Sequence, residues 1–327
     1  MLALVGLGYW GPNLLRNFNK LGVVEAAFDL NESRLEEYYN SPTYKDIYFG
    51  NDWEVCLGRS DIKGVAIATP PDTHFEIAKK ALLSGKHVFC EKPLTLKVEH
   101  AEELVNIAKD KNLILMVGHT FLYSSEIRKI KEFIELGLLG DILYIISNRL
   151  NLGKFQKSGV IEDLMPHDIS ICNFLVGSSV RKVRAAGYSF IHGEAVFDEV
   201  AFVDLVYDNG VVANLNVSWL YPVKERKLAV VGSKRMLIYD MMASEKIKVF
   251  DKGVDKKPNN YGEYLLSYRH GDTWSPDLPV IEPLFVECSH FIECIKHGIR
   301  PFTDGINGLE VVKVLNMILD EVKKNGD

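Results

Sequence analysis

Short apolar runs alternate with amphipathic stretches along the first 119 residues. The first run covers Leu2 to Val5, and the stretch after it places Leu14, Leu15 and Phe18 at helical spacing. Further apolar runs at 61–71, 86–93 and 113–119 predict strands, and the stretches at 74–85 and 97–112 predict helices. Strands that alternate with helices in this way predict a doubly wound parallel sheet.

The pattern changes in the second half of the chain. Between Val180 and Phe250 apolar and polar positions alternate in six runs, and Asp208-Asn209-Gly210 separates two of them as a hairpin turn would. A new helical stretch begins at Phe121, directly after the last run of the first half. The sequence therefore predicts an α/β chain in two domains. Residues 1–119 form the parallel sheet, and residues 120–327 form an α+β domain with a large, mainly antiparallel open sheet.

Composition and charge exclude several classes of protein. The chain has 327 residues, 47% of them apolar, and a formal net charge of −6, which gives no general reason to bind nucleic acid or an anionic membrane. No apolar stretch approaches the roughly 20 residues of a membrane span, and the opening run lacks the basic start of a signal peptide. Five scattered cysteines do not resemble a disulfide framework, so we expect a cytoplasmic protein.

The first strand runs into a glycine-rich turn with the spacing G-x-G-x-x-G. Gly6, Gly8 and Gly11 enclose Leu7, Tyr9 and Trp10, and Pro12 opens the helix that follows. Such a turn lets the backbone approach a pyrophosphate closely, at the positive end of a helix. Asp29 ends the next strand, about 20 positions on, where an acid accepts hydrogen bonds from a ribose diol and repels a 2′-phosphate. This predicts NAD as cofactor, although Arg34 leaves NADP open as the less favoured choice.

Ligands of parallel sheets bind outside the carboxyl ends of the strands. At those ends the chain carries Thr69-Pro70-Pro71, Glu91-Lys92-Pro93 and Gly118-His119. We expect these loops to line one site together with the glycine-rich turn.

The chain resembles the Gfo/Idh/MocA oxidoreductases. The resemblance rests on GLGYWG at 6–11, on ATPPDTHFEIAKKALLSGKHVFCEKPL at 68–94 and on DLMPHDISI at 163–171, which occur in the family's order. It implies a Rossmann domain followed by an α/β domain whose open sheet supports subunit contacts, so we expect a homo-oligomer, a dimer or tetramer. A sheet face covered by the chain's own helices is the alternative. The resemblance also makes Lys92, in EKP, the catalytic lysine.

Asp163 and His167 lie one turn apart on a predicted helix and share its direction. The resemblance matches both to the family's D-x-x-x-H motif. Oxidation of an alcohol needs a base for the hydroxyl proton and a cation beside the developing alkoxide. We predict His167 as base or acid, Lys92 as the polarising cation, and Asp163 as a residue that fixes the imidazole or binds a substrate hydroxyl.

The predicted site residues fall into three groups. The catalytic residues are Lys92, His167 and Asp163. The cofactor-binding residues are Gly6, Gly8, Tyr9, Trp10, Gly11, Asp29, Thr69, Pro70, His74, Glu91 and Lys92. The substrate-binding residues are Lys92, His119, Arg149, Asp163 and His167, and we expect no metal. Arg149, Lys154, Lys224 and Arg226 are candidates to meet a diphosphate or a sugar carboxylate, with solvated surface as the alternative for each.

Within the family, the chain is most similar to the nucleotide-sugar branch, which acts at C3 of sugars such as UDP-N-acetylglucosamine. Alternatives are a dehydrogenase of a free sugar or inositol, an NAD-dependent glycosidase, and a non-catalytic NAD(P)-binding regulator. The presence of Lys92 and His167 favours an enzyme over the regulator.

Overall fold

The computed structural model describes residues 1–153, 155, 158–192, 197–258 and 264–325, and it divides into two compact units. The first unit comprises Met1–Tyr123 and Ile281–Lys313, and the second comprises Ser124–Val280 and Val314–Asp327. Lys154, one of the candidate cations, lies outside the described residues. Among the described helices, none has both the length and the apolar character that crossing a membrane requires.

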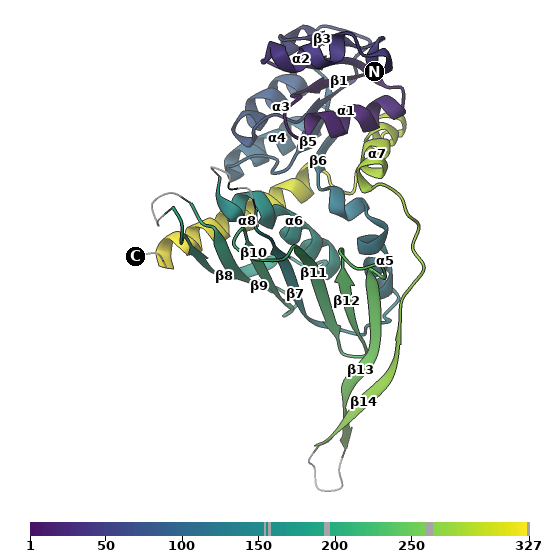
Figure 1. Cartoon of the computed structure of the whole chain (residues 1–327), viewed down its shortest axis with the longest axis vertical. Coiled ribbons are helices and arrows are strands. Elements are labelled where there is room, and N and C mark those ends of the chain that lie inside the picture. Colours follow the sequence, from purple (N-terminus) through teal and green to yellow (C-terminus); the bar gives the residue numbers. More distant parts are fainter. Residues whose placement is uncertain (154, 156–157, 193–196, 259–263, 326–327) are drawn as a thin grey trace. The chain divides into compact units, whose positions relative to one another are not determined.

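The first unit contains a six-stranded sheet in the order β3-β2-β1-β4-β5-β6, with every neighbouring pair parallel (Figure 1). This confirms the predicted doubly wound sheet. Its elements are β1 (Leu2–Val5), α1 (Gly11–Lys20), β2 (Val24–Phe28), α2 (Glu32–Tyr39), β3 (Tyr48–Gly50), β4 (Gly64–Ile67), α3 (His74–Leu83), β5 (His87–Glu91), α4 (Val98–Asp110), β6 (Leu115–Gly118) and α7 (Pro283–His297). Short 3-10 turns lie at Pro42–Tyr44, Trp53–Cys56, Pro71–Thr73 and Thr120–Tyr123.

Both faces of this sheet are covered by helices. On one face the buried side chains of α3 and α4 form a single apolar cluster with the strands, which includes Val5, Val65 and Val88. On the other face Phe18 of α1, Phe89 of β5 and Phe291 of α7 meet edge to face, with ring centroids 5.7 to 6.3 Å apart. Burial on both faces explains why the strands are continuously apolar in sequence.

The position of α7 differs from the expected division at residue 119. Residues 281–313 pack with the first unit, although a division at residue 119 would place them in the second domain. The physical reason is the aromatic contact of Phe291, together with an ion pair at the start of the helix. Both Arg16 and Asn17 of α1 donate hydrogen bonds to the Glu282 carboxylate, at 2.5 and 3.0 Å to Oε1.

The second unit contains an eight-stranded sheet in the order β14-β13-β12-β11-β7-β10-β9-β8. Every neighbouring pair is antiparallel except β7 with β10, which is parallel. The mainly antiparallel open sheet is therefore confirmed. Its elements are α5 (Ser125–Glu135), β7 (Ile142–Leu150), α6 (Gly159–Val176), β8 (Val180–Tyr188), β9 (Val200–Tyr207), β10 (Val212–Ser218), β11 (Glu225–Gly232), β12 (Met236–Asp240), β13 (Ile247–Pro258) and β14 (Tyr264–Trp274).

One face of this second sheet packs against α6, which contacts β7, β9 and β10. Residues such as Ile145, Val203 and Leu215 point to that face and are buried, while their neighbours along each strand are more exposed. Gly210 has a φ of +87° in the turn between β9 and β10, which confirms the predicted hairpin. The last helix, α8 (Gly305–Asn325), contributes residues to both units.

Candidate active site

The glycine-rich turn has no room for side chains at two of its positions. A Cβ at Gly11 would lie 2.1 Å from the carbonyl oxygen of Gly6, and a Cβ at Gly6 would lie 2.7 Å from that of Ala68. Gly6 also has a φ of +98°, which disfavours any other residue. The turn leads directly into the N-terminus of α1. A bare backbone at a helix N-terminus fits the pyrophosphate of a dinucleotide.

Asp29 ties this turn to the end of β2. Its Oδ2 accepts the backbone N–H of Leu7 at 2.7 Å, and its Oδ1 accepts that of Asn31 at 2.8 Å. The Arg34 guanidinium lies 3.2 Å from Oδ2 and forms an ion pair with it. The carboxylate is therefore held in place as an acceptor beside the turn. The Arg34 guanidinium also lies by the turn, since a Cβ at Gly8 would stand 3.5 Å from its Nη1.

The two aromatic residues of the turn differ in their surroundings. Tyr9 is 96% exposed, whereas Trp10 is 37% exposed. Both rings are therefore exposed to solvent beside the place that the turn offers to a dinucleotide, and Tyr9 almost completely.

His74 is placed differently from a residue that contacts a ligand. It is buried, with Nδ1 2.8 Å from the carbonyl oxygen of Pro93 and Nε2 2.9 Å from that of Thr69. Burial lowers the pKa of the ring. The buried imidazole therefore joins the loop that contains Thr69 and Pro70 to the loop after Lys92.

Three further predicted residues lie at the carboxyl ends of β5 and β6. Glu91 is the last residue of β5, Lys92 follows it in a cis peptide bond to Pro93, and His119 follows β6. Burial raises the pKa of Glu91 to about 7, although the Lys92 charge opposes this. Burial and the Lys92 charge together lower the pKa of His119 to about 3, so its imidazole is neutral. The first unit thus brings all these residues to one edge of its sheet.

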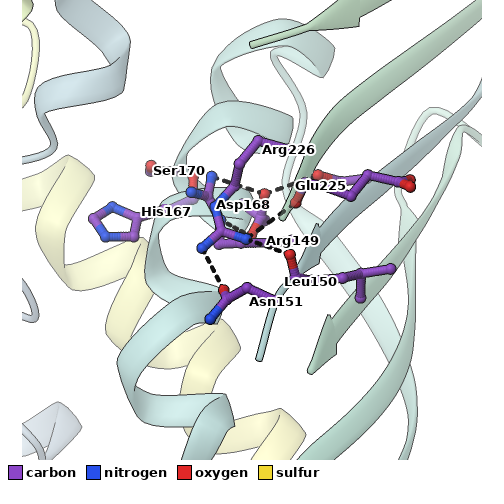
Figure 2. A network of polar contacts seen from close by, with 9 residues as sticks. Arg149, Leu150, Asn151, His167, Asp168, Ser170, Glu225 and Arg226 are labelled. Atoms are coloured by element: carbon purple, nitrogen blue, oxygen red, sulfur yellow. Dashed lines mark hydrogen bonds and ion pairs between the residues drawn. The ribbon is translucent and has the colours of Figure 1, made fainter. Parts of the chain in front are cut away.

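In the second unit, Asp163 and His167 lie on α6, as the sequence predicts. They occupy successive turns on the partly exposed side of the helix, whereas Met165, Asp168 and Ile169 are buried. Figure 2 shows the His167 ring on the side of α6 that faces away from the neighbouring ion pair. Acid and imidazole therefore share one face, which suits work on a common ligand.

Arg149 differs from the expectation of a cation that contacts substrate. Its guanidinium is buried, with Nε 2.6 Å from Asp168 Oδ2 and Nη2 3.1 Å from Oδ1 (Figure 2). The Ser147 hydroxyl donates to the same carboxylate at 2.8 Å. This bidentate pair fastens α6 to β7 one residue after His167. These contacts join α6 to β7, and a contact of Arg149 with substrate stays a prediction.

Arg226 is fixed beside this pair. Its guanidinium donates to Asn151 Oδ1 at 2.7 Å and to the carbonyl oxygen of Leu150 at 3.1 Å (Figure 2). Burial, together with the positive charge of Arg149, lowers the pKa of Arg226 to about 10. By contrast, Lys224 is exposed.

Two acidic residues of these sites are absent from the sequence-based prediction. Asp168 is the buried partner of Arg149, and Glu287 of α7 is fully buried in the first unit. Both stand among apolar residues, in DISI and LFVEC, and a charge inside an apolar helix is the available signal. The partner of each acid lies far away in the sequence. A charged residue in an apolar helix therefore does not indicate which residue it contacts.

Comparison with known proteins gives a family. Residues 1–119 match the model described as the oxidoreductase family with an NAD-binding Rossmann fold, and residues 127–238 match the GFO/IDH/MocA C-terminal domain.

Several relatives are similar along nearly the whole chain. UDP-N-acetylglucosamine 3-dehydrogenase of Acidithiobacillus ferrooxidans is 25% identical over 95% of this chain and 93% of its own length. One of its crystal structures superposes with a TM-score of 0.84, covering 100% of this chain and 98% of that one, at 24% identity. Myo-inositol 2-dehydrogenase of Thermotoga maritima is 24% identical over 94% of this chain and 91% of its own length. A levoglucosan dehydrogenase in complex with NADH shares the fold, with a TM-score of 0.82 at 21% identity over 99% of this chain and 96% of that one.

The buried ion pair yields a stability prediction. We expect Asp168→Ala to lower the free energy of unfolding by about 3–5 kcal/mol, because it leaves the buried Arg149 guanidinium without its counter-charge. The double variant R149M/D168L removes both charges and should be less destabilised than the single variant. Urea unfolding followed by circular dichroism measures both. A loss below about 1 kcal/mol for Asp168→Ala would contradict a fastening role.

Proposed function

Because this chain belongs to the Gfo/Idh/MocA family of NAD-binding oxidoreductases, we propose that it transfers a hydride between NAD and C3 of a nucleotide sugar. The observation that carries the proposal is the similarity to UDP-N-acetylglucosamine 3-dehydrogenase along 95% of this chain. The same family includes relatives named for inositol and levoglucosan, so a free polyol or sugar is the second candidate.

In this proposal Lys92 and His167 act on the same substrate oxygen. When the sugar is oxidised, His167 takes the hydroxyl proton while the Lys92 ammonium stabilises the negative charge that develops on that oxygen. NAD, when held by the glycine-rich turn and Asp29, would supply the acceptor for the hydride on the adjacent carbon. Asp163, one turn before His167 on the same face of α6, orients the imidazole or binds a neighbouring hydroxyl. Reduction uses the same groups in reverse.

We propose NAD as the preferred cofactor over NADP. The Asp29 carboxylate is already fixed by two backbone N–H groups, so a ribose diol meets a positioned acceptor at little cost in ordering. A 2′-phosphate would meet this negative charge first, with Arg34 the only cation bonded to Asp29 among the described residues.

We further propose that the second unit forms a homo-oligomer through the face of its sheet opposite α6. Ile146, Phe202 and Ile238 are exposed there, on three different strands. A polar ladder accompanies them, because Asn216 donates to Asn148 at 2.9 Å and Asn214 donates to Asp204 at 2.7 Å. Apolar side chains mixed with ordered amides are typical of subunit interfaces.

The proposed activity is tested by absorbance at 340 nm with NAD and a panel of UDP- and dTDP-sugars, free hexoses and inositols. We expect NADH to form with a UDP-sugar, and mass spectrometry to show a product two mass units lighter. His167→Ala should lower kcat/KM by about 10²- to 10⁴-fold with NAD affinity little changed. Lys92→Ala should lower kcat/KM by a similar factor.

His297→Ala, an exposed histidine on α7, is the matched control and should keep full activity. Turnover of inositol alone would replace the nucleotide sugar by the second candidate. Normal turnover in His167→Ala would remove that residue as the base.

Cofactor choice depends on the charge of Asp29. We expect Asp29→Asn to lower the ratio of kcat/KM for NAD to that for NADP by about 10- to 100-fold, since the amide accepts less strongly and no longer repels a phosphate. The loss also frees Arg34 to pair with that phosphate. The double variant D29N/R34A should therefore lose the gain with NADP, and an unchanged ratio in D29N would refute the role of Asp29.

The oligomer is tested by light scattering on the purified chain. We expect a dimer or tetramer, and Ile146→Glu together with Phe202→Glu should shift the mass toward the monomer, because like charges would then face each other across the interface. A monomeric wild-type chain would rule out this interface.

A further inference from the structure

Strands β13 and β14 continue as a two-stranded arm, residues 251–258 and 264–272, beyond the end of the second sheet (Figure 1). β12 pairs with β13 only from Ile247 to Phe250, whereas β13 pairs with β14 as far as Pro258. β14 is the last strand in the sheet order, so β13 is the only strand beside it. A two-stranded ribbon is marginally stable in water by itself, and the arm therefore needs support from another surface.

One face of the arm is tied to its own sheet by charged side chains. Arg269 donates from Nε to Asp251 Oδ1 at 3.0 Å and from Nη1 to Asp255 Oδ1 at 2.6 Å. Its Nη2 donates to the carbonyl oxygen of Lys234, in the turn between β11 and β12. Gly253 leaves room for the guanidinium, since a Cβ there would stand 2.5 Å from Arg269 Nη2. These contacts hold the base of the arm in line with the sheet.

The other face of the arm carries exposed apolar side chains. Val254 and Tyr268 are register partners and are 47% and 69% exposed, and Leu266 is 53% exposed. Side chains alternate along a strand, so Val254 shares a face of β13 with Lys248, the register partner of Ile238. The irregular pairing near the base places its extra residue on β14 and leaves this alternation intact. The arm thus continues the open face of the sheet, which we define as the face opposite α6.

A second apolar cluster lies on the open face, at the edge formed by β8 and β9. Tyr188 stacks on Phe190, with ring centroids 6.0 Å apart, and meets Phe202 edge to face at 6.3 Å. The three side chains are 47%, 68% and 49% exposed, respectively. Phe202 is the register partner of Asn216, whose amide belongs to the polar ladder of the open face. We call Tyr188, Phe190 and Phe202 the aromatic corner.

A buried carboxylate holds the aromatic corner in place. Glu199 is fully buried and accepts the backbone N–H groups of Phe190, Ile191 and His192 at 2.8 to 2.9 Å. The same carboxylate lies 2.9 Å from His192 Nδ1. Three successive N–H groups on one anion fix the turn that carries Phe190. Little conformational freedom is therefore lost when a partner covers that ring.

The register places the arm and the aromatic corner at opposite corners of the open face. Tyr188 lies in the row of paired residues that ends at Glu225, the first residue of β11. Phe250, from which the arm continues, lies in the row of Lys182, near the start of β8. A two-fold axis in the plane of this face can bring the arm of one copy over the aromatic corner of another. The same contact then forms a second time.

We propose that the arm of one chain packs its apolar face on the aromatic corner of a second copy, so that two chains exchange arms. The inference rests on the proposed homo-oligomer and deepens it, because it names the contacts that orient the two sheets. Apolar side chains are removed from water on both sides of each contact. The partner thereby supplies the support that the ribbon lacks in a single chain.

Cross-linking of the full chain tests this contact, because all five native cysteines are buried. Phe190→Cys and Tyr268→Cys each add one exposed thiol. We expect a short bismaleimide to join these two variants, co-expressed with tags of different length, into a covalent dimer with one chain of each. Neither variant by itself should be joined, because the two copies of each residue lie at opposite ends of a two-fold contact.

Leu136→Cys is the matched control. Leu136 is 72% exposed and ends α5, a helix that packs against α6 and hence lies on the other side of the sheet. It replaces Phe190→Cys in the co-expression and should not be joined to Tyr268→Cys.

Charge exchange measures how much the contact contributes to association. Phe190→Lys and Tyr268→Glu should each weaken the association of the chains by about 10-fold in analytical ultracentrifugation. The double variant should recover most of this loss, because opposite charges then meet across the contact.

Three outcomes would overturn the proposal. An oligomer without cross-links between positions 190 and 268, or a double variant no stronger than the single ones, would exclude the exchange of arms and leave the open face as the interface. A monomeric wild-type chain would exclude the exchange and the interface together. Neither experiment uses sugar or NAD, so the result is independent of the proposed hydride transfer.

Discussion

All strands of the six-stranded sheet run in one direction, and this constraint brings the candidate cofactor residues together. The strands end at the same edge, so the glycine-rich turn after β1, Asp29 after β2, Thr69 after β4, Glu91 at the end of β5 and His119 after β6 meet there although 113 positions separate Gly6 from His119. Close contacts at this edge then limit which residues can occupy it. Gly6 and Gly11 leave no space for a Cβ, and the space over Gly118 is taken by the carboxylate of Glu91.

Buried charge is used in two different ways in the two units. In the second unit Arg149 and Asp168 satisfy each other bidentately, with Ser147 on the same carboxylate, so the charges are matched and the contact is structural. In the first unit Glu91 and Glu287 share a region with one neighbouring ammonium and few donors. Matched buried charges hold a fold in register, whereas unequal ones are sensitive to protonation. The helix that carries His167 is thus held by a matched ion pair, whereas the buried carboxyl groups in the unit that carries Lys92 are not matched.

Local patterns were sufficient for much of the fold. The alternation of strands and helices predicts the parallel sheet, and GLGYWG predicts the bare turn, because both depend on residues close together in sequence. The boundary of the first unit, β14 and the partners of Arg149 and Glu287 were not predicted. The boundary and the two partners depend on contacts between residues far apart in the sequence, such as Phe18 with Phe291 or Arg149 with Asp168. By contrast, β14 pairs with the neighbouring strand β13 along the chain. His74 shows the same limit, since its sequence position suggests a ligand contact and its two carbonyl partners give it a supporting role.

The return of α7 to the first unit affects the order in which the chain can fold during synthesis. Phe18 and Phe89 are synthesised early. The ring of Phe291, which packs against both, is synthesised about 200 residues after Phe89. Until then the part of that face which α7 covers stays open to water or to a chaperone, while the whole eight-stranded sheet is being made. A fragment that stops at residue 119 would keep the same open face permanently.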